Sequence, residues 1–185
     1  MCNSLRELCY NVPDQSIYGE LTDGSIAKLV SYVKQFSSVT ILDIGSGSGA
    51  TLCAFAKHMP KTSCDLVGVE ISQIRATISR QIIPHYLPPN AKKWLIIEDN
   101  VLTWSALPPC NISFSFDTTF TKALMTHIVT LQLNCPELQF VISSKGSRYY
   151  DTSLWSIITT VPCKLKGSGQ TISFHVRIKK KTLKH

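Results

Sequence analysis

Apolar residues recur along the chain in two alternating patterns. Short runs rich in β-branched residues, such as VTILDI, are typical of buried strands, and the stretches between them carry apolar residues at helical spacing. The first pattern predicts strands at residues 39–44, 65–70, 94–98, 111–116 and 138–144. The second predicts helices at residues 23–36, 52–59, 74–82 and 120–133.

Residues that start or stop helices set the limits of these segments. Asp23 or Ser25 is placed to cap the first helix, and Pro60 and Pro84 end the second and the third. The apolar stripe of the third helix consists of Ile74, Ile78 and Ile82.

The alternation of strands and helices predicts an α/β fold. Crossover helices are expected on both faces of a mostly parallel sheet. The last two β-rich runs, residues 154–165 and 171–180, flank the turn-forming segment KGSGQ and predict an antiparallel hairpin. A parallel sheet closed by such a hairpin is found in fewer fold families than a plain dinucleotide-binding fold, so it limits the possible folds further.

Composition excludes several classes of protein. The chain has 185 residues, which fits one domain, and 44% of them are hydrophobic. No apolar run approaches the roughly 18–20 residues that span a bilayer, and MCNSLRELCYN has no secretory signal core, so we expect no membrane association. The seven cysteines include no C-x-x-C pair, which favours buried thiols in a reducing intracellular compartment over a metal site.

Positive charge gathers near the C-terminus. The net charge is +7, and after Asp151 the chain has seven lysines and arginines but no acid. A basic end of this kind favours a polyanionic partner such as nucleic acid. For the final KKKTLKH, a solvated tail without a specific partner is the alternative.

The segment GSGSG, residues 45–49, is expected between the first strand and its helix. In an open parallel sheet, ligands bind at the carboxyl ends of the strands, and glycines there let a ligand approach the backbone. Glu70 ends the second strand, where a carboxylate can accept both hydroxyls of a ribose. Asp99 follows the third strand and could accept a hydrogen bond from an adenine amino group; a turn-forming role is its alternative.

The glycine segment also fits a nicotinamide dinucleotide, because GSGSGA matches G-x-G-x-x-A. However, a pyrophosphate would be poorly placed beside Asp43, which lies two residues before the first glycine. A cationic ligand without phosphates that carries an amino acid and a nucleoside suits these acids better. S-adenosylmethionine is such a ligand.

Four segments together resemble a known family: IYGEL at residues 17–21, LDIGSGSG at 42–49, VISSKGSRYY at 141–150 and GSGQTISFHVRI at 167–178. Their order and spacing are similar to those of the non-SET histone lysine methyltransferases of the disruptor-of-telomeric-silencing type, within the class I S-adenosylmethionine-dependent methyltransferases. The resemblance implies a seven-stranded Rossmann-like sheet. It places the methyltransferase domain at residues 17–178, after an irregular segment at 1–16 and before a basic tail at 179–185.

The resemblance also implies a role for each matching residue of the cofactor site. Tyr18 and Glu20 would close a loop over the methionyl part of the cofactor, although an aromatic staple and a solvated acid remain alternatives. Asp43, Gly45 and Gly47 would hold its amino-acid end. Glu70 would bind the ribose, and Asp99 with Asn100 the adenine. Ala50 and Asn100 depart from the residues usual in the family, so cofactor affinity could differ.

The segment DTTF, residues 117–120, is similar to the D-P-P-Y motif of many amino-group methyltransferases. In such a motif, carboxylate or carbonyl oxygens orient a neutral nitrogen, and an aromatic ring supports the developing cation. Asp117, Phe120 and Phe174, which stands where the family has a channel tyrosine, are therefore the candidate catalytic residues. The alternative is that Asp117 ends a strand and caps the next helix.

We therefore expect an S-adenosylmethionine-dependent enzyme that methylates a lysine amino group of a nucleosomal histone. Its basic C-terminal region would contact the nucleosome, both histone and DNA, in the nucleus. Three alternatives stay open, one of them an oxidoreductase that binds the nicotinamide dinucleotide considered above. The chain could methylate RNA or a non-histone protein, or it could be an inactive interaction module that keeps the cofactor fold.

Overall fold

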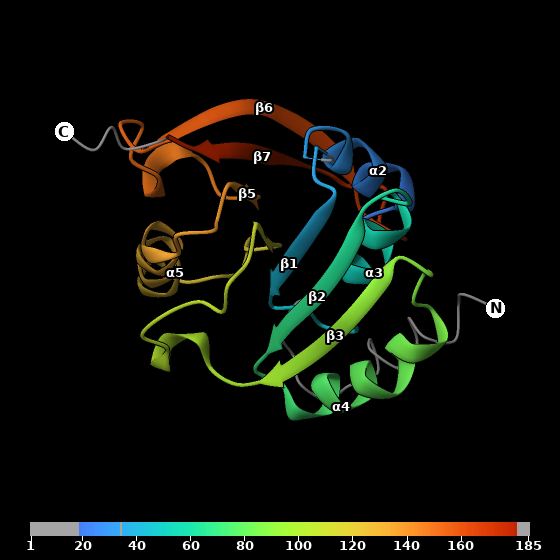
Figure 1. Cartoon of the computed structure of the whole chain (residues 1–185). Helices are drawn as coiled ribbons and strands as arrows, with labels where there is room; N and C mark the ends of the chain where they lie inside the picture. The colour runs from blue at the N-terminus through green and yellow to red at the C-terminus, as the bar shows by residue number, and fades with distance from the viewer. Residues whose placement is uncertain (1–18, 34, 181–185) are drawn as a thin grey trace.

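A seven-stranded sheet forms the centre of the molecule (Figure 1), in a computed structural model that describes residues 19–33 and 35–180. The strands lie in the order β3-β2-β1-β4-β5-β7-β6. Their bounds are β1 (Ser38–Ile44), β2 (Ser63–Glu70), β3 (Ala91–Glu98), β4 (Ile112–Ser115), β5 (Phe140–Ser143), β6 (Trp155–Lys164) and β7 (Thr171–Lys179). The first five strands are parallel, whereas β7 pairs antiparallel with both β5 and β6. The predicted parallel sheet with a closing hairpin is confirmed.

Helices cover both faces of the sheet. They are α2 (Asp23–Ser31), α3 (Ala50–Lys57), α4 (Gln73–Ile82) and α5 (Lys122–Asn134), with the short 3₁₀ segments η1 (Ile83–His85), η2 (Val101–Thr103) and η3 (Ser147–Tyr149). α2, α3 and α4 pack with one hydrophobic core cluster, and α5 packs with a second cluster on the opposite face (Figure 1). The order of the strands reverses between β1 and β4, and ligands bind at this point in open α/β sheets.

The first helix is shorter than its hydrophobic pattern predicts. α2 ends at Ser31, so the expected continuation to Phe36 is wrong. Phe36 is partly buried by tertiary packing instead, with its ring edge-on to that of Phe140 and the ring centres 5.8 Å apart. The cap was also misassigned, because the Thr22 hydroxyl accepts the hydrogen bond from the Ser25 amide and Asp23 lies inside the first turn.

The third helix forms as predicted but presents a different face to the core. Ile74 is 49% exposed, whereas Ala76 and Ser79 are fully buried. The cause is the close approach of α3: a Cβ added to Gly49 would lie 2.9 Å from the Ser79 hydroxyl oxygen and 2.4 Å from Cδ1 of Ile83. Ala76 and Ser79 are small enough to lie at this contact, whereas Ile74 is exposed and Ile78 and Ile82 are only half-buried.

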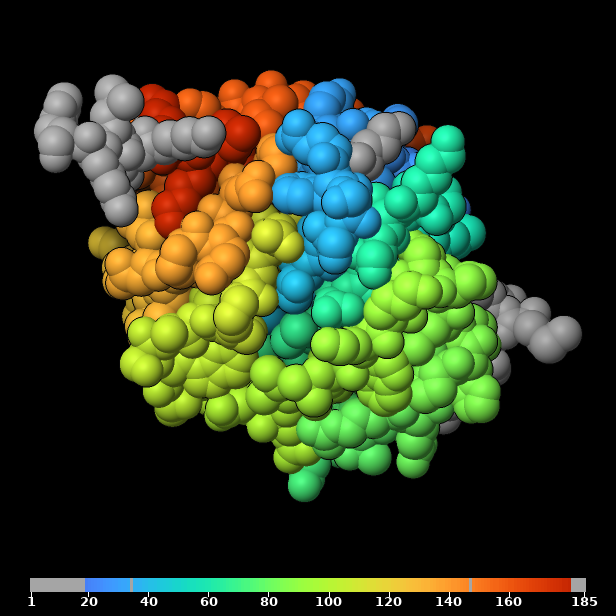
Figure 2. Space-filling view, in the orientation of Figure 1, coloured from blue at the N-terminus to red at the C-terminus, as the bar shows by residue number. Residues whose placement is uncertain are grey.

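The segment before α2 is fastened to the β6–β7 hairpin. The Thr22 amide donates to the Lys164 carbonyl at 3.0 Å, and the Lys166 amide donates to the Glu20 carbonyl at 2.8 Å. The hairpin borders the top of the face shown in Figure 2, opposite the β3 and α4 region at the bottom. In the described ranges, all five cysteines are buried, and no helix is long and apolar enough to cross a membrane.

Candidate active site

The glycine loop, residues 45–49, joins β1 to α3 at the carboxyl edge of the sheet. Gly45, Gly47 and Gly49 have φ angles of 81°, 53° and 75°, a left-handed region that side chains disfavour. The amides of Gly45 and Ser46 both donate to the carbonyl of Val69, at 2.8 and 2.9 Å. The end of β2 therefore holds the loop in a tight bend.

Glu70 connects this loop to the neighbouring strand ends. Its carboxylate is buried, and its two oxygens accept from the amides of Gly47 and Ser72, each at 2.9 Å. The Glu70 carbonyl accepts from the Asp99 amide at 3.2 Å. Each carboxylate oxygen has two lone pairs, so Glu70 can still accept hydrogen bonds from a ligand.

Asp43 is the most unusual polar residue at this edge. It lies on β1, paired with Gly68 and Phe114 of the adjacent strands, and is only 2% exposed. Its carboxylate makes no hydrogen bond to any residue in the described part of the chain. Burial, and then the charge of Glu70, raise the pKa of Asp43 to about 8. A buried carboxyl group without partners is costly unless a ligand satisfies it.

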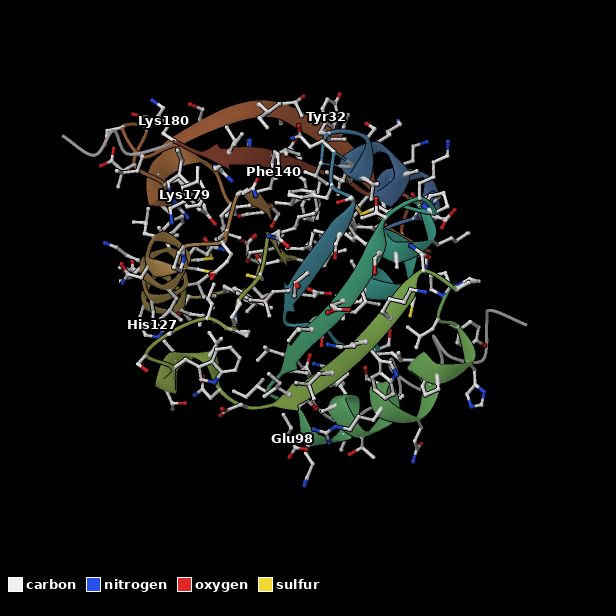
Figure 3. All side chains as sticks on the ribbon, in the orientation of Figure 1. Tyr32, Glu98, His127, Phe140, Lys179 and Lys180 are labelled. Carbon is white, nitrogen blue, oxygen red and sulfur yellow. The ribbon has the colours of Figure 1, made fainter. Side chains whose placement is uncertain are left out.

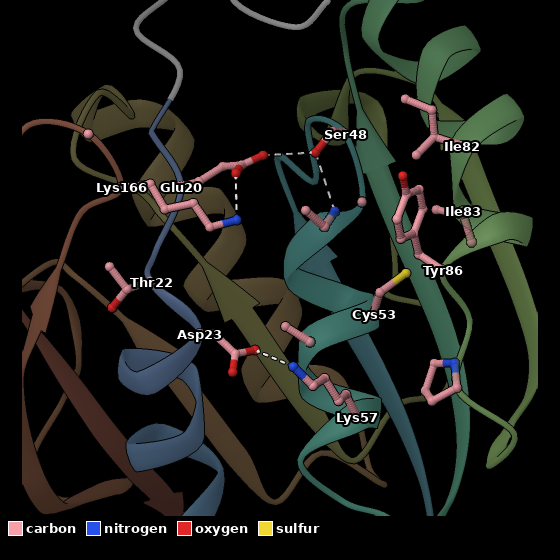
Figure 4. Close-up of a pocket in the computed structure, with 15 residues that line it drawn as sticks. Glu20, Thr22, Asp23, Ser48, Cys53, Lys57, Ile82, Ile83, Tyr86 and Lys166 are labelled. Atoms are coloured by element: carbon pink, nitrogen blue, oxygen red, sulfur yellow. Dashed lines mark hydrogen bonds and ion pairs between the residues drawn. The ribbon is translucent and has the colours of Figure 1, made fainter. Parts of the chain in front are cut away.

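Glu20 connects the glycine loop to the hairpin (Figure 4). One of its carboxylate oxygens accepts from the Ser48 hydroxyl at 3.1 Å, and the other forms a salt bridge of 2.9 Å with the Lys166 ammonium. Glu20 is nine-tenths buried, so this bridge is partly shielded from solvent. The sequence predicted Glu20 but neither partner, because Lys166 is 146 residues away along the chain.

A cavity of about 730 Å³ lies beside the glycine loop and runs along α3 (Figure 4). Ser48 and Gly49 line one end, Lys57 lines α3 further along, and Ile83 with Tyr86 form an apolar wall. Asp43, Glu70 and Asp99 are not among its lining residues. The cavity therefore adjoins the predicted cofactor site and does not coincide with it.

Asp99 and Asn100 fix the chain that leaves β3. Asp99 is exposed, and its two oxygens accept from the Asn100 amide and the Trp104 indole nitrogen, both at 2.7 Å. The Asn100 side chain caps η2 by accepting from the Leu102 amide at 3.1 Å. Asp99 thus holds an aromatic side chain next to the end of β3, a partner that the sequence did not reveal.

Asp117 lies two residues after the end of β4 and is completely buried. Its carboxylate accepts five hydrogen bonds, all from residues at the ends of β4 and β5. The donors are the hydroxyls of Ser115 (3.3 Å), Ser143 (2.5 Å) and Ser144, and the amides of Ser144 (2.9 Å) and Lys145 (3.0 Å). The alternative helix-cap role is not observed, since Thr121 caps α5.

A buried arginine lies close to this cluster. Arg177 of β7 is fully buried, its guanidinium carbon lies 4.1 Å from the centre of the Tyr150 ring, and its Nη2 donates to the Lys145 carbonyl at 2.9 Å. Burial lowers the pKa of Arg177, and the nearby Asp117 carboxylate opposes this shift. The segment VISSK therefore supplies most of the donors to Asp117 and a carbonyl to Arg177.

The predicted aromatic residues lie apart from one another. Phe120 packs against the α5-side cluster, and a Cβ added to Gly45 would lie 3.2 Å from its Cζ. Phe174 is fully buried in the other cluster, stacked on Phe114 at 5.5 Å and tilted against Phe116 at 5.6 Å. Its role as a channel residue stays a prediction, and in this conformation its ring is part of the core. Tyr18 lies outside the described residues.

Two basic residues at the end of β7 have structural partners (Figure 3). The Lys179 ammonium donates to the carbonyls of Leu133 and Cys135 at the end of α5, at 2.6 and 3.0 Å. The Lys180 ammonium donates to the Thr152 carbonyl at 2.8 Å. Residues 181–185 of the predicted tail lie outside the described ranges.

The structure thus gathers Asp43, Gly45, Gly47 and Glu70 around one bend, with Phe120 over Gly45. Asp99 and Glu20 lie at its two sides and are fixed by their own partners. Among the described residues, no group of three or more histidine, cysteine or acidic side chains is arranged to hold a metal ion. An organic ligand with a cationic group and hydrogen-bond donors is what these carboxylates could hold.

Solved structures of similar fold are methyltransferases with little sequence identity to the chain. Magnesium protoporphyrin IX methyltransferase from Synechocystis PCC 6803, solved with bound S-adenosylmethionine, is 11% identical, with a TM-score of 0.62 over 85% of this chain and 78% of that one. A methyltransferase from Geobacter sulfurreducens in complex with S-adenosylhomocysteine has a TM-score of 0.60 and 13% identity, over 87% and 74%. The 23S rRNA methyltransferase ErmE has a TM-score of 0.61 and 16% identity, over 88% and 70%.

These structures establish the fold alone, and no match was found among curated proteins. A family match covers residues 2–94, just over half of the chain, and includes Glu20, the glycine loop and Glu70. That family is described as the histone methylation protein DOT1. The chain belongs to this family.

Proposed function

We propose that the chain binds S-adenosylmethionine at the glycine loop and transfers its methyl group to a lysine amino group of a nucleosomal histone. The observation that carries the proposal is Asp43. This buried carboxyl group has no hydrogen-bond partner in the described part of the chain, and it lies immediately before a loop of left-handed glycines. The ammonium of an amino acid would supply both the missing charge and the missing donors.

The neighbouring residues fit the rest of that cofactor. Glu70 keeps free lone pairs for the ribose hydroxyls, and Asp99 keeps them for the adenine amino group. Gly45 leaves space at the point where a side chain would meet the Phe120 ring. Asn100, by contrast, uses its side-chain oxygen to cap η2, so its prediction as a cofactor contact depends on its remaining amide group.

When bound, S-adenosylmethionine supplies a methyl group on a sulfonium sulfur, which is a good leaving group. The residues of this chain therefore act mainly by positioning the acceptor. Asp117 holds residues 117–120, which we name the acceptor loop, against the end of β5. The acceptor lysine has to arrive as the neutral amine because its ammonium has no lone pair. That Asp117 itself orients the amine stays a prediction, since in this conformation five donors surround its carboxylate.

The proposed acceptor, a histone lysine in a nucleosome, rests on the family match and on the net charge of the chain. The DOT1 description supports a histone lysine, and the net charge of +7 supports an acidic partner such as nucleosomal DNA. A nuclear location follows from that substrate. Methylation of RNA is the alternative within the same chemistry, and one solved neighbour of similar fold is an rRNA methyltransferase.

Calorimetric titration with S-adenosylmethionine tests the cofactor site. We expect Asp43→Asn to weaken binding at least 100-fold and Gly47→Arg to abolish it, because φ at Gly47 is 53° and its amide is needed by Glu70. Gly24→Arg is the matched control, since a Cβ at Gly24 meets nothing within 4 Å. Unchanged affinity in both site variants would overturn the proposed site. Binding of a nicotinamide dinucleotide instead would favour the oxidoreductase reading.

Labelled cofactor tests the acceptor. Nucleosomes, free histones and RNA are incubated in parallel with the protein, and the label is located by mass spectrometry. Label on a histone lysine in nucleosomes is the expected result. Label on RNA would replace the histone proposal, and cofactor binding without any turnover would indicate an interaction module.

A further inference from the structure

A lysine of the chain itself reaches into the acceptor loop. The Lys145 ammonium donates a hydrogen bond of 2.9 Å to the carbonyl of Thr118, the residue that follows Asp117. Among the described residues, no carboxylate forms a salt bridge with Lys145. The amine is therefore held by a neutral carbonyl, and losing its proton breaks no ion pair.

Hydrogen bonds fix the backbone of Lys145 at both its amide and its carbonyl. The position of its side chain is therefore set by more than its own contact with Thr118. Its amide donates to Asp117 at 3.0 Å and to the Ser143 hydroxyl at 3.1 Å. Its carbonyl accepts from the buried Arg177 at 2.9 Å. These hydrogen bonds fix the backbone position of Lys145. Its side chain then extends from the end of β5 to Thr118, which follows β4.

The Thr118 carbonyl lies where an acceptor amine is expected. It belongs to the four-residue DTTF segment, in which the Phe120 amide donates to the Asp117 carbonyl at 3.1 Å and closes a turn. That turn places the Phe120 ring over Gly45 of the glycine loop. An amine bound to Thr118 is thus two residues along the chain from the ring that covers the glycine loop, which would hold the methyl donor.

We propose that Lys145 is a methyl acceptor in cis, so that the protein modifies its own acceptor loop; this inference rests on the proposed cofactor site. Water first removes the proton from the Lys145 ammonium. The lone pair of Nζ then forms a bond to the methyl carbon, and the carbon–sulfur bond breaks with its electron pair remaining on sulfur. The products are methylated Lys145 and S-adenosylhomocysteine. Lys145 uses one lone pair of the Thr118 carbonyl, so an external lysine would displace it or share that oxygen with it.

The test is incubation of the purified full chain with methyl-labelled S-adenosylmethionine and no other substrate. We expect peptide mass spectrometry to find the label at Lys145, and label to be lost by more than 20-fold in Lys145→Arg, which keeps the cation and a donor for Thr118. Lys92→Arg is the matched control, because the Lys92 ammonium also donates to a backbone carbonyl, that of Pro89 at 3.4 Å, away from the acceptor loop. Its labelling should equal that of the wild type.

Two further measurements separate this inference from the cofactor proposal. The label per molecule should not change on tenfold dilution, and a Gly47→Arg chain mixed with active Lys145→Arg chain should stay unlabelled, because transfer is within one molecule. Cofactor binding by calorimetry without label at Lys145 would overturn the inference and leave the cofactor site intact. Absence of cofactor binding would overturn both, and label spread over other lysines would overturn the inference alone.

Discussion

Two buried aspartates at the carboxyl edge of the sheet have opposite surroundings. Asp43 on β1 and Asp117 at the end of the adjacent β4 are 2% and 0% exposed. Asp117 accepts five hydrogen bonds, whereas Asp43 accepts none from the described residues. The two aspartates are therefore almost equally buried, and they differ in the number of hydrogen bonds that each carboxylate accepts.

We interpret this difference as one between a carboxylate that holds the architecture and, under the proposed function, a carboxylate that binds the cofactor. A fully bonded carboxylate stabilises the segments that supply its donors, here the ends of β4 and β5. A buried carboxyl group without donors destabilises the fold and is retained where a ligand compensates it.

Replacing Asp117 should have the largest effect. We expect Asp117→Ala to lower the free energy of unfolding by about 3–5 kcal/mol, since it leaves the buried Arg177 and several donors without their anion. Urea denaturation measures this loss, and Ser115→Ala, which removes only the longest of the five bonds, should cost about 1 kcal/mol. On the folded protein, turnover should fall far more than cofactor affinity. If Asp117→Ala and Ser115→Ala lowered the free energy of unfolding equally, the structural role assigned to Asp117 would be wrong.

The corresponding change at Asp43 should have the opposite sign. We expect Asp43→Asn to raise the free energy of unfolding by about 1–3 kcal/mol at pH 8, because it removes a buried charge that has no partner in the described structure. The same substitution should weaken cofactor binding. Asp117→Asn, measured beside it, should be destabilising. If both substitutions destabilise the protein, Asp43 has a partner and the contrast is lost.

The pH dependence of stability should also reveal the ionisation of Asp43. Its pKa is raised from 3.8 to about 8 in the folded chain, so the folded state binds the proton more tightly than the unfolded state. The resulting stabilisation is complete below pH 3.8 and is lost as the pH rises to 8, by at most about 1.4 kcal/mol per pH unit. Thermal or urea unfolding of wild type and Asp43→Asn at several pH values gives the difference. Parallel curves for the two proteins would show that Asp43 ionises normally.

Much of the fold and part of the site could be predicted from the sequence. The spacing of apolar residues predicted the sheet and its closing hairpin, because the strands are short runs rich in β-branched residues. The buried face of α4 was missed, since the packing of Gly49 against Ser79 is a tertiary constraint that no local pattern contains.

The acids of the site were found because they stand at the ends of predicted strands. Their partners were not, because contacts such as Glu20 with Lys166 and Asp117 with Lys145 join residues far apart in the chain. Both Asp43 and Asp117 were predicted from the sequence as site residues, and only for Asp117 was a structural role, as a helix cap, left open as an alternative. Only the donors contributed by the VISSK segment distinguish the two.

The smallest expected effect concerns Tyr150, whose ring packs against the guanidinium of Arg177 beside the Asp117 cluster. Burial raises the pKa of Tyr150 well above its ordinary value, so its hydroxyl stays protonated and donates to the Gln132 side chain at 3.2 Å. Tyr150→Phe keeps the ring under Arg177 and loses that bond, at a cost of about 1 kcal/mol by urea denaturation. Tyr150→Leu also removes the ring and should cost more. If Tyr150→Phe costs as much as Asp117→Ala, the tyrosine hydroxyl and not the carboxylate holds the cluster, and Asp117 would no longer be the counterpart of Asp43.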